Sequence, residues 1–201
     1  AEQLGSTIVA VTVNVADASE LYTYGAEKVI SITNDALSTF NAKGYAAVLS
    51  QVAAQENATV VVVDSSVNGL YFAPLLAINL NAGYASNVVA LPSATSPFTV
   101  KRKAFSSKAF NNTEINTAIK VIGLAKNSYG VHENAVSGSS ESFDAQVSAS
   151  DLSVKSVSVE KASGTITIAD ADIVVSAGRG LKGPENWGMI EELAAVLGAA
   201  T

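Results

Sequence analysis

The sequence predicts an α/β protein with a mainly parallel sheet and flanking helices, of the Rossmann-like or nucleotide-hydrolase-like kind. Three observations favour this class. Up to Leu91, strand-like apolar runs alternate with segments of helical periodicity, which is the order of a parallel sheet with crossover connections. The run Thr59–Asp64 is apolar without alternation, as in strands covered on both faces. Apolar residues make up 48% of the chain, enough for a sizeable core.

The first elements are a helix end and two strands. Residues 1–5 have the composition of a helix end closed by Gly5. The β-branched run Thr7–Val13 then predicts a strand. A second strand, Lys28–Thr33, is predicted after the turn-like pair Tyr24-Gly25.

The next four elements complete the alternating part. Residues 44–57 carry apolar side chains at i, i+3, i+4 and i+7, which predicts a helix with one buried face, formed by Tyr45, Val48, Leu49 and Val52. We expect Thr59–Asp64 to be a central parallel strand. A helix over residues 68–80 follows, with Phe72, Leu75 and Leu76 facing inward, and then a strand over residues 86–91.

The pattern changes after Pro92, where short β-rich segments predict additional antiparallel strands: Phe98–Lys103, Lys108–Phe110 and Ala118–Leu124. The polar stretch 127–142 predicts a surface loop. Two alternating runs then predict edge strands, Ala145–Ala149 and Ser153–Glu160, and residues 161–172 predict a connection.

The end of the chain predicts the first strand and helix of a second Rossmann-like domain. Residues 173–178 form an apolar run that enters a glycine-containing turn, and a helix is expected over residues 184–197. A lone strand and helix cannot bury their apolar faces. We therefore expect an α/β domain over residues 1–160 and an incomplete second domain over residues 161–201.

The composition of the chain disfavours several classes of partner and of chemical site. The net charge of −6 disfavours nucleic-acid and anionic-membrane partners. Without cysteine there is no disulfide, thiolate metal site or thiol nucleophile. No apolar run reaches the length of a membrane span and no secretion signal is visible, so we expect a soluble intracellular protein.

The segment that carries chemistry lies between the last predicted strand and helix. Gly178 and Gly180 permit a tight turn and close approach of a ligand. Pro184 suits the first turn of a helix, and a helix N-terminus attracts anions. Arg179, between the two glycines, can add a forked contact to a phosphate. The pattern is not the Gly-x-Gly-x-x-Gly fingerprint, and a plain turn with a solvated arginine is the alternative.

Residues 172–197 resemble the signature that opens the FAD domain of electron transfer flavoprotein α subunits. The matching features are Gly178-Arg179-Gly180-Leu181-Lys182, then Gly183, then Glu185-Asn186-Trp187. Ala177 stands where many members have glycine, and Pro184 varies the link.

The resemblance extends upstream, more weakly. Gly25-Ala26-Glu27-Lys28-Val29 is similar to the family's Gly-Ala-Asp-Lys-Val, and Val60–Leu80 is similar to the strand, loop and helix that follow. Residues 105–110 resemble a family strand, with departures at Ser106, Ser107 and Lys108. The family has a strand and helix of roughly 30 residues ahead of what is here Ala1 and continues past Thr201, so we expect a fragment.

The resemblance implies a function. It implies an electron carrier with no substrate turnover of its own, FAD as cofactor, and a heterodimer with the family's β subunit. Dehydrogenases, such as those of acyl-CoA, would donate electrons, and a quinone reductase or another acceptor would receive them. Arg179 would contact FAD at the pyrophosphate, Gly178 and Gly180 would allow its approach, and Lys182 and Asn186 would lie near it. We expect FAD to be absent from, or incompletely bound by, a fragment. The compartment would be the bacterial cytoplasm, or the mitochondrial matrix in a eukaryote.

Two other functions remain open. Asp64-Ser65-Ser66 follows the most apolar strand at the end where α/β sheets bind ligands, so the chain could be an ATP- or AMP-binding domain. It could also be a docking module without cofactor. We predict no catalytic group or metal site: His132 is the only histidine, and Asp170 and Asp172 have no second acidic pair. Lys101-Arg102-Lys103 is interpreted as a solvated edge.

Overall fold

The computed structural model describes residues 4–160, 167–168 and 171–201. The chain forms two compact units, Ala1–Ser156 and Val157–Thr201. The predicted helix end at residues 1–5 lies mostly outside the described residues, but Gly5 has the left-handed φ of +60° that is typical of a glycine closing a helix. The predicted connection over residues 161–172 also lies largely outside them.

A three-stranded parallel sheet opens the first unit. Its order is β1-β2-β9, with β1 at Val9–Val13, β2 at Lys28–Ile32 and β9 at Ser139–Ser142. The two strands predicted near residues 7–13 and 28–33 are confirmed. The loop predicted over residues 127–142 is wrong at its end, because β9 pairs with β2. All four residues of β9 are exposed, so their side chains carry no apolar pattern that could have indicated a strand.

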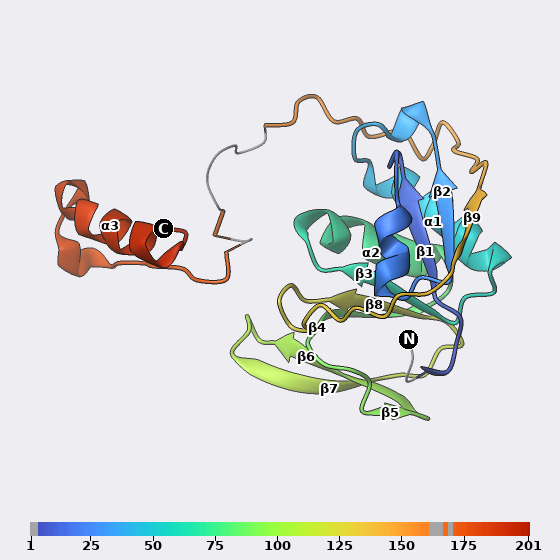
Figure 1. Ribbon diagram of the computed structural model, residues 1–201, viewed down its shortest axis with the longest axis horizontal. Helices are drawn as coiled ribbons and strands as arrows, with labels where there is room; N and C mark the ends of the chain where they lie inside the picture. Colours follow the sequence, from blue (N-terminus) through green and yellow to red (C-terminus); the bar gives the residue numbers. More distant parts are fainter. Residues whose placement is uncertain (1–3, 161–166, 169–170) are drawn as a thin grey trace. The chain divides into compact units, whose positions relative to one another are not determined.

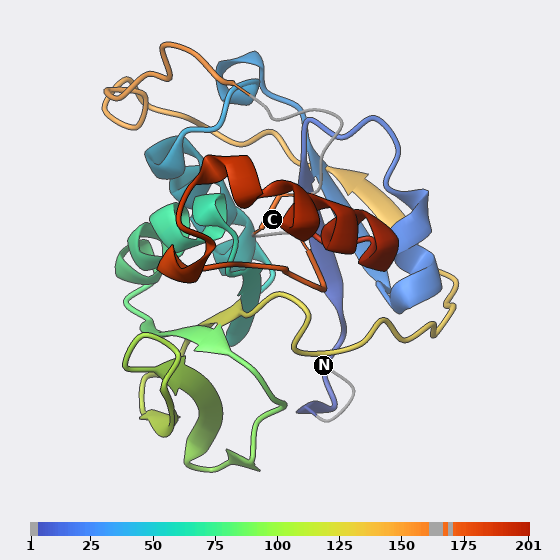
Figure 2. The ribbon, with the colours of Figure 1, turned by 90° about the vertical axis from the view of Figure 1, so that its left-hand side faces the viewer.

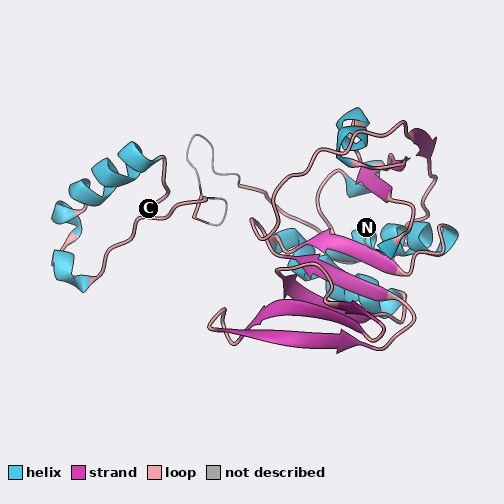
Figure 3. Cartoon of the chain, turned by 60° about the horizontal axis from the view of Figure 1, so that its bottom comes forward, coloured by secondary structure: helices cyan, strands magenta, loops and turns pink. Residues whose placement is uncertain are grey.

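A six-stranded sheet forms the other half of this unit (Figures 1 and 3). Its order is β3-β8-β4-β6-β5, and β7 pairs with β6. The strands are β3 Val60–Asp64, β4 Gly83–Val88, β5 Ala94–Thr95, β6 Phe98–Ala104, β7 Ala109–Ile115 and β8 Lys120–Leu124. Strands β3, β8 and β4 are parallel, whereas β5, β6 and β7 pair in antiparallel fashion. The parallel part and the antiparallel extension agree with the predicted fold class.

Two predicted positions in this sheet are wrong. The segment Ala118–Leu124 was expected to be antiparallel, but β8 runs parallel between β3 and β4 because its buried Val121 and Ile122 belong in the middle of a sheet. The strand Thr59–Asp64 was expected to be central, but β3 lies at the edge of its sheet, and β8 is its one partner among the described strands. The side chain of Val62 is consequently 59% exposed.

The predicted helices are confirmed as α1 Ala42–Gln55 and α2 Val67–Asn79. Each begins at a polar cap: Asn41 Oδ1 accepts the backbone N–H of Gly44 at 3.0 Å, and Ser66 Oγ accepts that of Gly69 at 3.1 Å. Such caps satisfy N–H groups that have no partner in the helix itself.

Three apolar clusters hold the first unit together. One joins α1 to the three-stranded sheet around Ile30, Ile32 and Val48. A second joins α2 and α1 to the parallel strands, with Ala73, Leu76 and Val121 at its centre. A third joins β4, β6, β7 and β8, and the half-buried Leu4 packs against it. Helix α1 therefore contributes to the clusters of both sheets.

The two edge strands predicted near the end of this unit are wrong. Residues 145–149 and 153–160 are irregular. The backbone of this stretch is bound by side chains instead of a strand: Gln51 accepts the N–H of Gln146 at 3.0 Å, and Asp151 accepts that of Ser148 at 2.9 Å. These contacts give the segment an alternative to sheet pairing.

An ion cluster joins the three-stranded sheet to α1. Lys28 Nζ lies 2.9 Å from Glu56 Oε1 and 2.7 Å from Glu141 Oε2. The hydrogen bond to Glu141, followed by that to Glu56, raises the pKa of Lys28. The bond to Lys28 lowers the pKa of Glu141 in turn.

We expect Lys28→Met to lower the melting temperature slightly at neutral pH, because ion pairs close to the surface contribute little each. A lowered pKa at Glu141 stabilises the fold above the pKa of an unfolded glutamate, and this contribution is lost as the pH falls through the folded value. The pKa of Lys28 is raised, so the contribution of Lys28 to the stability of the fold is lost only at alkaline pH. The difference between Lys28→Met and the unchanged chain should therefore vanish in acid, in thermal melts over a pH series. Lys103→Met, which alters an exposed lysine of β6, is the control; equal effects of both substitutions at neutral pH would contradict the prediction.

Candidate functional site

The candidate site lies in the second unit, where an extended segment enters a glycine-rich turn (Figure 2). The strand predicted over residues 173–178 is reduced to a single parallel bridge between Val174 and Ala200. The N–H of Val175 donates to Ala200 O at 2.9 Å, and the N–H of Ala200 donates to Ile173 O at 3.1 Å. Among the described residues of this unit no other strand lies beside the segment, and a strand needs a partner to form.

Two short 3₁₀ turns separate this segment from the helix. The first is Arg179–Leu181 and the second is Pro184–Asn186. Helix α3, Gly188–Leu197, begins four residues later than the predicted helix. The helix N-terminus and the Gly-Arg-Gly turn are therefore distinct features, and the single strand-to-helix corner expected from the sequence is wrong in this detail.

Backbone hydrogen bonds define the first turn. The N–H of Leu181 donates to Gly178 O at 3.1 Å, that of Lys182 to Arg179 O at 3.0 Å, and that of Gly183 to Leu181 O at 2.8 Å. Lys182 closes the turn with φ +68° and ψ −35°. A side-chain-bearing residue is rarely found in this conformation, which stores strain of about 1–3 kcal/mol. Such strain is found most often at functional sites, and the sequence contained no signal for it.

The two glycines of the turn are not required by the turn itself. Gly178 has an extended backbone, with φ −116°, and Gly180 has no positive φ. A Cβ atom added at either position would meet no atom of the described residues within 4 Å. The space beside both residues is therefore open, as close approach of a ligand to the backbone would require.

The turn carries two positively charged side chains, those of Arg179 and Lys182. Arg179 and Lys182 are exposed, and neither side chain forms a hydrogen bond or ion pair with another residue in the described part of the chain. A guanidinium presents several N–H donors in one plane, a geometry that suits two oxygens of a phosphate. The structure thus places Gly178, Arg179, Gly180 and Lys182 on one turn.

Asn186, in the second 3₁₀ turn, stabilises the first turn through its side chain. Its Nδ2 atom donates to the carbonyl oxygen of Leu181 at 2.7 Å. Trp187 is the N-cap of α3, and no side chain in the described part of the chain bonds to this end of the helix. Glu185 and Glu191 lie close to the start of this helix in sequence, and their negative charges oppose an anion there. Within this segment, the Gly-Arg-Gly turn is the better position for a phosphate.

Most of the other residues named in the sequence analysis have structural partners. Asp64 Oδ1 accepts the N–H of Ser66 at 3.1 Å and its hydroxyl at 2.6 Å, so it orders the turn that leads into α2. The interpretation of Lys101-Arg102-Lys103 as a solvated edge is wrong, because β6 pairs with β7 along this run and with β4 at Arg102. Arg102 donates from Nε to Ser86 O at 3.0 Å, and Lys101 Nζ lies 4.5 Å from the centre of the Phe110 ring. His132 packs against Tyr129.

Within the described ranges, no group of three or more His, Cys, Asp or Glu side chains could hold a metal ion. None of the helices there is both long enough and apolar enough to cross a membrane. Asp170, weighed above as a ligand, lies outside the described residues.

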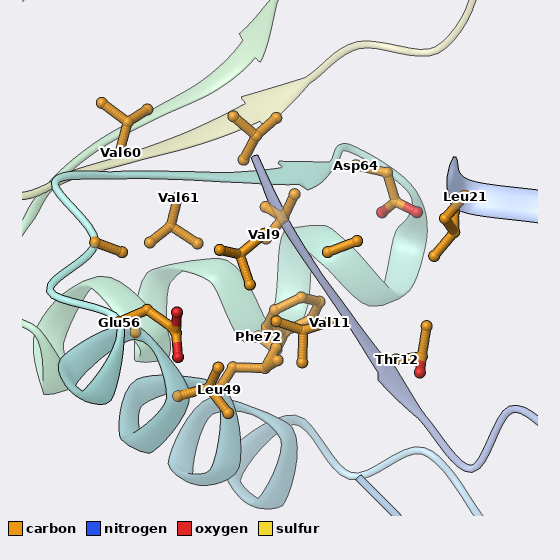
Figure 4. A pocket seen from close by; sticks show the side chains of 16 residues that line it. Val9, Val11, Thr12, Leu21, Leu49, Glu56, Val60, Val61, Asp64 and Phe72 are labelled. Carbon is orange, nitrogen blue, oxygen red and sulfur yellow. The ribbon is translucent and has the colours of Figure 1, made fainter. Parts of the chain in front are cut away.

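Sequence reasoning missed a groove in the first unit. It has a volume of about 510 Å³ and lies between β1 and β3, with Leu49 and Phe72 among its lining residues (Figure 4). The signal that could have indicated it was the apolar character of β3, which is greater than an edge strand needs.

The fold defines a parallel α/β protein, joined to a second unit that carries a Gly-Arg-Gly turn ahead of a helix. Residues 1–155 match the model of the electron transfer flavoprotein domain, and residues 167–201 match that of the electron transfer flavoprotein FAD-binding domain. The chain belongs to the electron transfer flavoprotein family, and several of its relatives are alpha subunits.

Three of these relatives are similar over most of the chain. The electron transfer flavoprotein subunit alpha of Bacillus subtilis is 33% identical over 186 residues, which are 91% of this chain and 57% of that protein. The subunits alpha of Thermoanaerobacterium thermosaccharolyticum and Syntrophomonas wolfei are each 30% identical, over 89% and 91% of this chain and 56% and 58% of their own lengths. The chain therefore spans little more than half the length of these relatives.

Proposed function

We propose that the chain is part of an electron transfer flavoprotein alpha subunit that binds FAD through the turn Gly178–Lys182. The intact protein accepts electrons from dehydrogenases, such as those that oxidise acyl-CoA, and passes them to a downstream acceptor of the respiratory chain. It turns over no substrate of its own. The observation that carries the proposal is the exposed guanidinium of Arg179, which has no partner among the described residues and stands between two glycines whose added Cβ atoms would meet none of those residues.

The residues of the turn fit one part of FAD, its pyrophosphate. The guanidinium of Arg179 would donate to two phosphate oxygens, and Gly178 and Gly180 would let these oxygens approach the backbone. Lys182 would add a second positive charge, and Asn186 would hold the turn in place through its bond to Leu181. When bound, the flavin supplies the redox chemistry, while the protein contributes position and electrostatics.

We assign residues 1–160 to the family's N-terminal α/β domain and residues 161–201 to the start of its FAD-binding domain. The division of the chain after Ser156 and the bounds of the two family models support this assignment. By analogy with the alpha subunits it resembles, the protein would form a heterodimer with a beta subunit, in the cytoplasm of a bacterium.

The test uses the complete alpha subunit, purified together with its beta subunit. The complex should be yellow and should release FAD in equimolar amount on denaturation. The 201-residue chain purified alone should be colourless. Addition of an acyl-CoA dehydrogenase and its substrate should bleach the flavin absorbance of the complex.

The alternatives give different results in the same preparation. A complex that contains no FAD, although both subunits are folded and associated, would refute the proposal and would favour a docking module. Release of ATP or AMP from the 201-residue chain would favour nucleotide binding at the Asp64 edge. Thermal melts with each nucleotide added to that chain would then distinguish specific binding from contamination.

A further inference from the structure

Helix α2 is apolar on all of its sides. Its 13 residues, Val67–Asn79, include no charged side chain. The inward side packs through Ala73, Leu76 and Ala77 against the parallel strands. A helix at the surface of a protein normally carries charged residues on the side away from the core, whereas a helix that is apolar all round is normally buried. The outer side of α2 therefore lacks the composition of a surface that faces water.

Four apolar residues form a regular row along this outer side. Val67, Tyr71 and Ile78 are 67%, 67% and 72% exposed. Together with the half-buried Pro74 they follow one another at intervals of four, three and four residues. This spacing keeps side chains on one line along a helix, and two helices with nearly aligned axes pack through such lines. We call Val67, Tyr71, Pro74 and Ile78 the outer row of α2.

The residues beside the outer row are uncharged as well. Leu70, on one side of the row, is 43% exposed, and Leu75, on the other side, is half-buried. The polar side chains of α2 are the amides of Asn68 and Asn79. Interfaces between different proteins are commonly selected by complementary charges at their rims. The outer row has no charge of its own with which to select a charged partner.

The charge of the whole chain favours a second copy as the partner. The net charge is −6, so two copies repel each other over most of their surfaces. This repulsion is smallest where both contacting faces are uncharged. Most homodimers are symmetric about a two-fold axis, which sets the same face of each copy against itself. The charge-free side of α2 is therefore suited to contact with itself.

The ends of α2 favour an antiparallel contact between the two helices. Asp64 is exposed and lies three residues before the helix begins. A parallel pair would bring two Asp64 carboxylates together and align the two helix dipoles, whereas an antiparallel pair separates the carboxylates and opposes the dipoles. In the antiparallel pair Val67 faces Ile78 of the other copy. Tyr71 faces Pro74, and each of these contacts occurs twice.

A lipid surface matches α2 less well than a second copy does. Helices that lie on membranes combine an apolar side with a polar side rich in lysine and arginine. α2 has no lysine or arginine, and the side opposite the outer row packs against the sheet. A protein surface of the same apolar character is the better match.

We propose that the outer row of α2 is the contact between two copies of this chain, packed antiparallel about a two-fold axis. The centre of the contact is only four side chains per copy, which is smaller than the interfaces of permanent dimers. We therefore expect a weak dimer with a dissociation constant in the micromolar range, so that the dilute chain is monomeric. The proposal does not depend on flavin binding or on a beta subunit, because it rests on α2 and on the charge of the chain.

Sedimentation velocity tests the proposal on the full-length product of the gene, together with any subunit that co-purifies with it. The mass of the assembly should double as its concentration rises from about 1 µM to about 500 µM. Tyr71→Glu buries a carboxylate in each half of the contact and should raise the dissociation constant at least about tenfold. Val131→Glu is the matched control, because it places the same charge on an exposed side chain outside α2 and should leave the dissociation constant unchanged.

Four outcomes would overturn the proposal. The mass could stay constant over the whole concentration range, or both variants could weaken the dimer equally. Loss of a co-purifying subunit from Tyr71→Glu, but not from Val131→Glu, would identify that subunit as the occupant of the outer row. Binding to phosphatidylcholine vesicles that is lost in Tyr71→Glu alone would identify a lipid surface.

Cysteine cross-linking gives a second measurement, because the 201-residue chain contains no cysteine. Chains carrying Val67→Cys and chains carrying Ile78→Cys are mixed in equal amounts in a glutathione buffer, at a concentration where the dimer forms. A disulfide requires Cα atoms within about 7 Å of each other. The antiparallel contact therefore predicts at least about tenfold more mixed disulfide than disulfide between like chains. Statistical proportions of the three products would exclude this contact.

Discussion

Arg179→Ala is expected to raise the dissociation constant of FAD by roughly 10- to 100-fold in the complete alpha–beta complex. A hydrogen bond to a charged group contributes about 1.5–3 kcal/mol, and each 1.4 kcal/mol corresponds to a factor of ten in affinity. Because Arg179 has no partner of its own among the described residues, its removal should leave the turn intact. The measurement is a titration of the flavin-free complex with FAD, followed by fluorescence.

Two further variants make this result specific. Arg179→Lys keeps the charge but loses the forked geometry, so its affinity should lie between those of the wild type and the alanine variant. Lys155→Ala removes an exposed cation outside the turn and should leave FAD affinity unchanged. If Arg179→Ala binds FAD as tightly as Lys155→Ala does, Arg179 does not contact the cofactor.

Leu76→Ala should lower the free energy of unfolding of the 201-residue chain by about 2–5 kcal/mol. Leu76 is fully buried at the centre of the cluster between α2 and the parallel strands, so truncation removes apolar burial and leaves a cavity. Urea denaturation followed by circular dichroism at helical wavelengths measures the change. Ile78→Ala alters the same helix at a side chain that is 72% exposed and should shift the free energy by less than about 0.5 kcal/mol. Similar losses in both variants would mean that α2 is not held by this cluster.

The parallel α/β part of the fold could be predicted because local pattern and tertiary position agree there. Val48 and Val52 lie at helical spacing and are buried in α1, and the β-branched runs before and after that helix are strands. Asn41 and Ser66 are typical N-cap residues and do cap α1 and α2.

An element could not be predicted where its own side chains carry no pattern that indicates which strand or side chain it bonds to. β9 consists of exposed polar residues and is a strand only because β2 offers an edge and Lys28 an ion-pair partner. The direction of β8 is likewise decided by β3 and β4, which are distant in sequence. The run Ala145–Ala149 alternates like a strand, but Gln51 binds its backbone instead.

At the candidate site, the sequence indicated which residues lie on the same turn but not the backbone conformation of that turn. Gly178, Arg179, Gly180 and Lys182 do lie on one turn. The two 3₁₀ turns and the positive φ of Lys182 depend on backbone hydrogen bonds that carry no side-chain pattern, and so they were not predicted. Their contact with FAD stays a prediction until the arginine variants are measured.

Trp187, the residue that precedes α3, is the only tryptophan of the chain, and all six tyrosines lie before residue 157. Excitation at the red edge of the aromatic band therefore selects the second unit, whereas tyrosine emission comes from the first. The polypeptide thus carries two natural optical reporters, one for each unit. Unfolding of the α/β sheets could be followed by tyrosine emission and rearrangement around the Gly-Arg-Gly turn by tryptophan emission, in the same sample and without an attached dye.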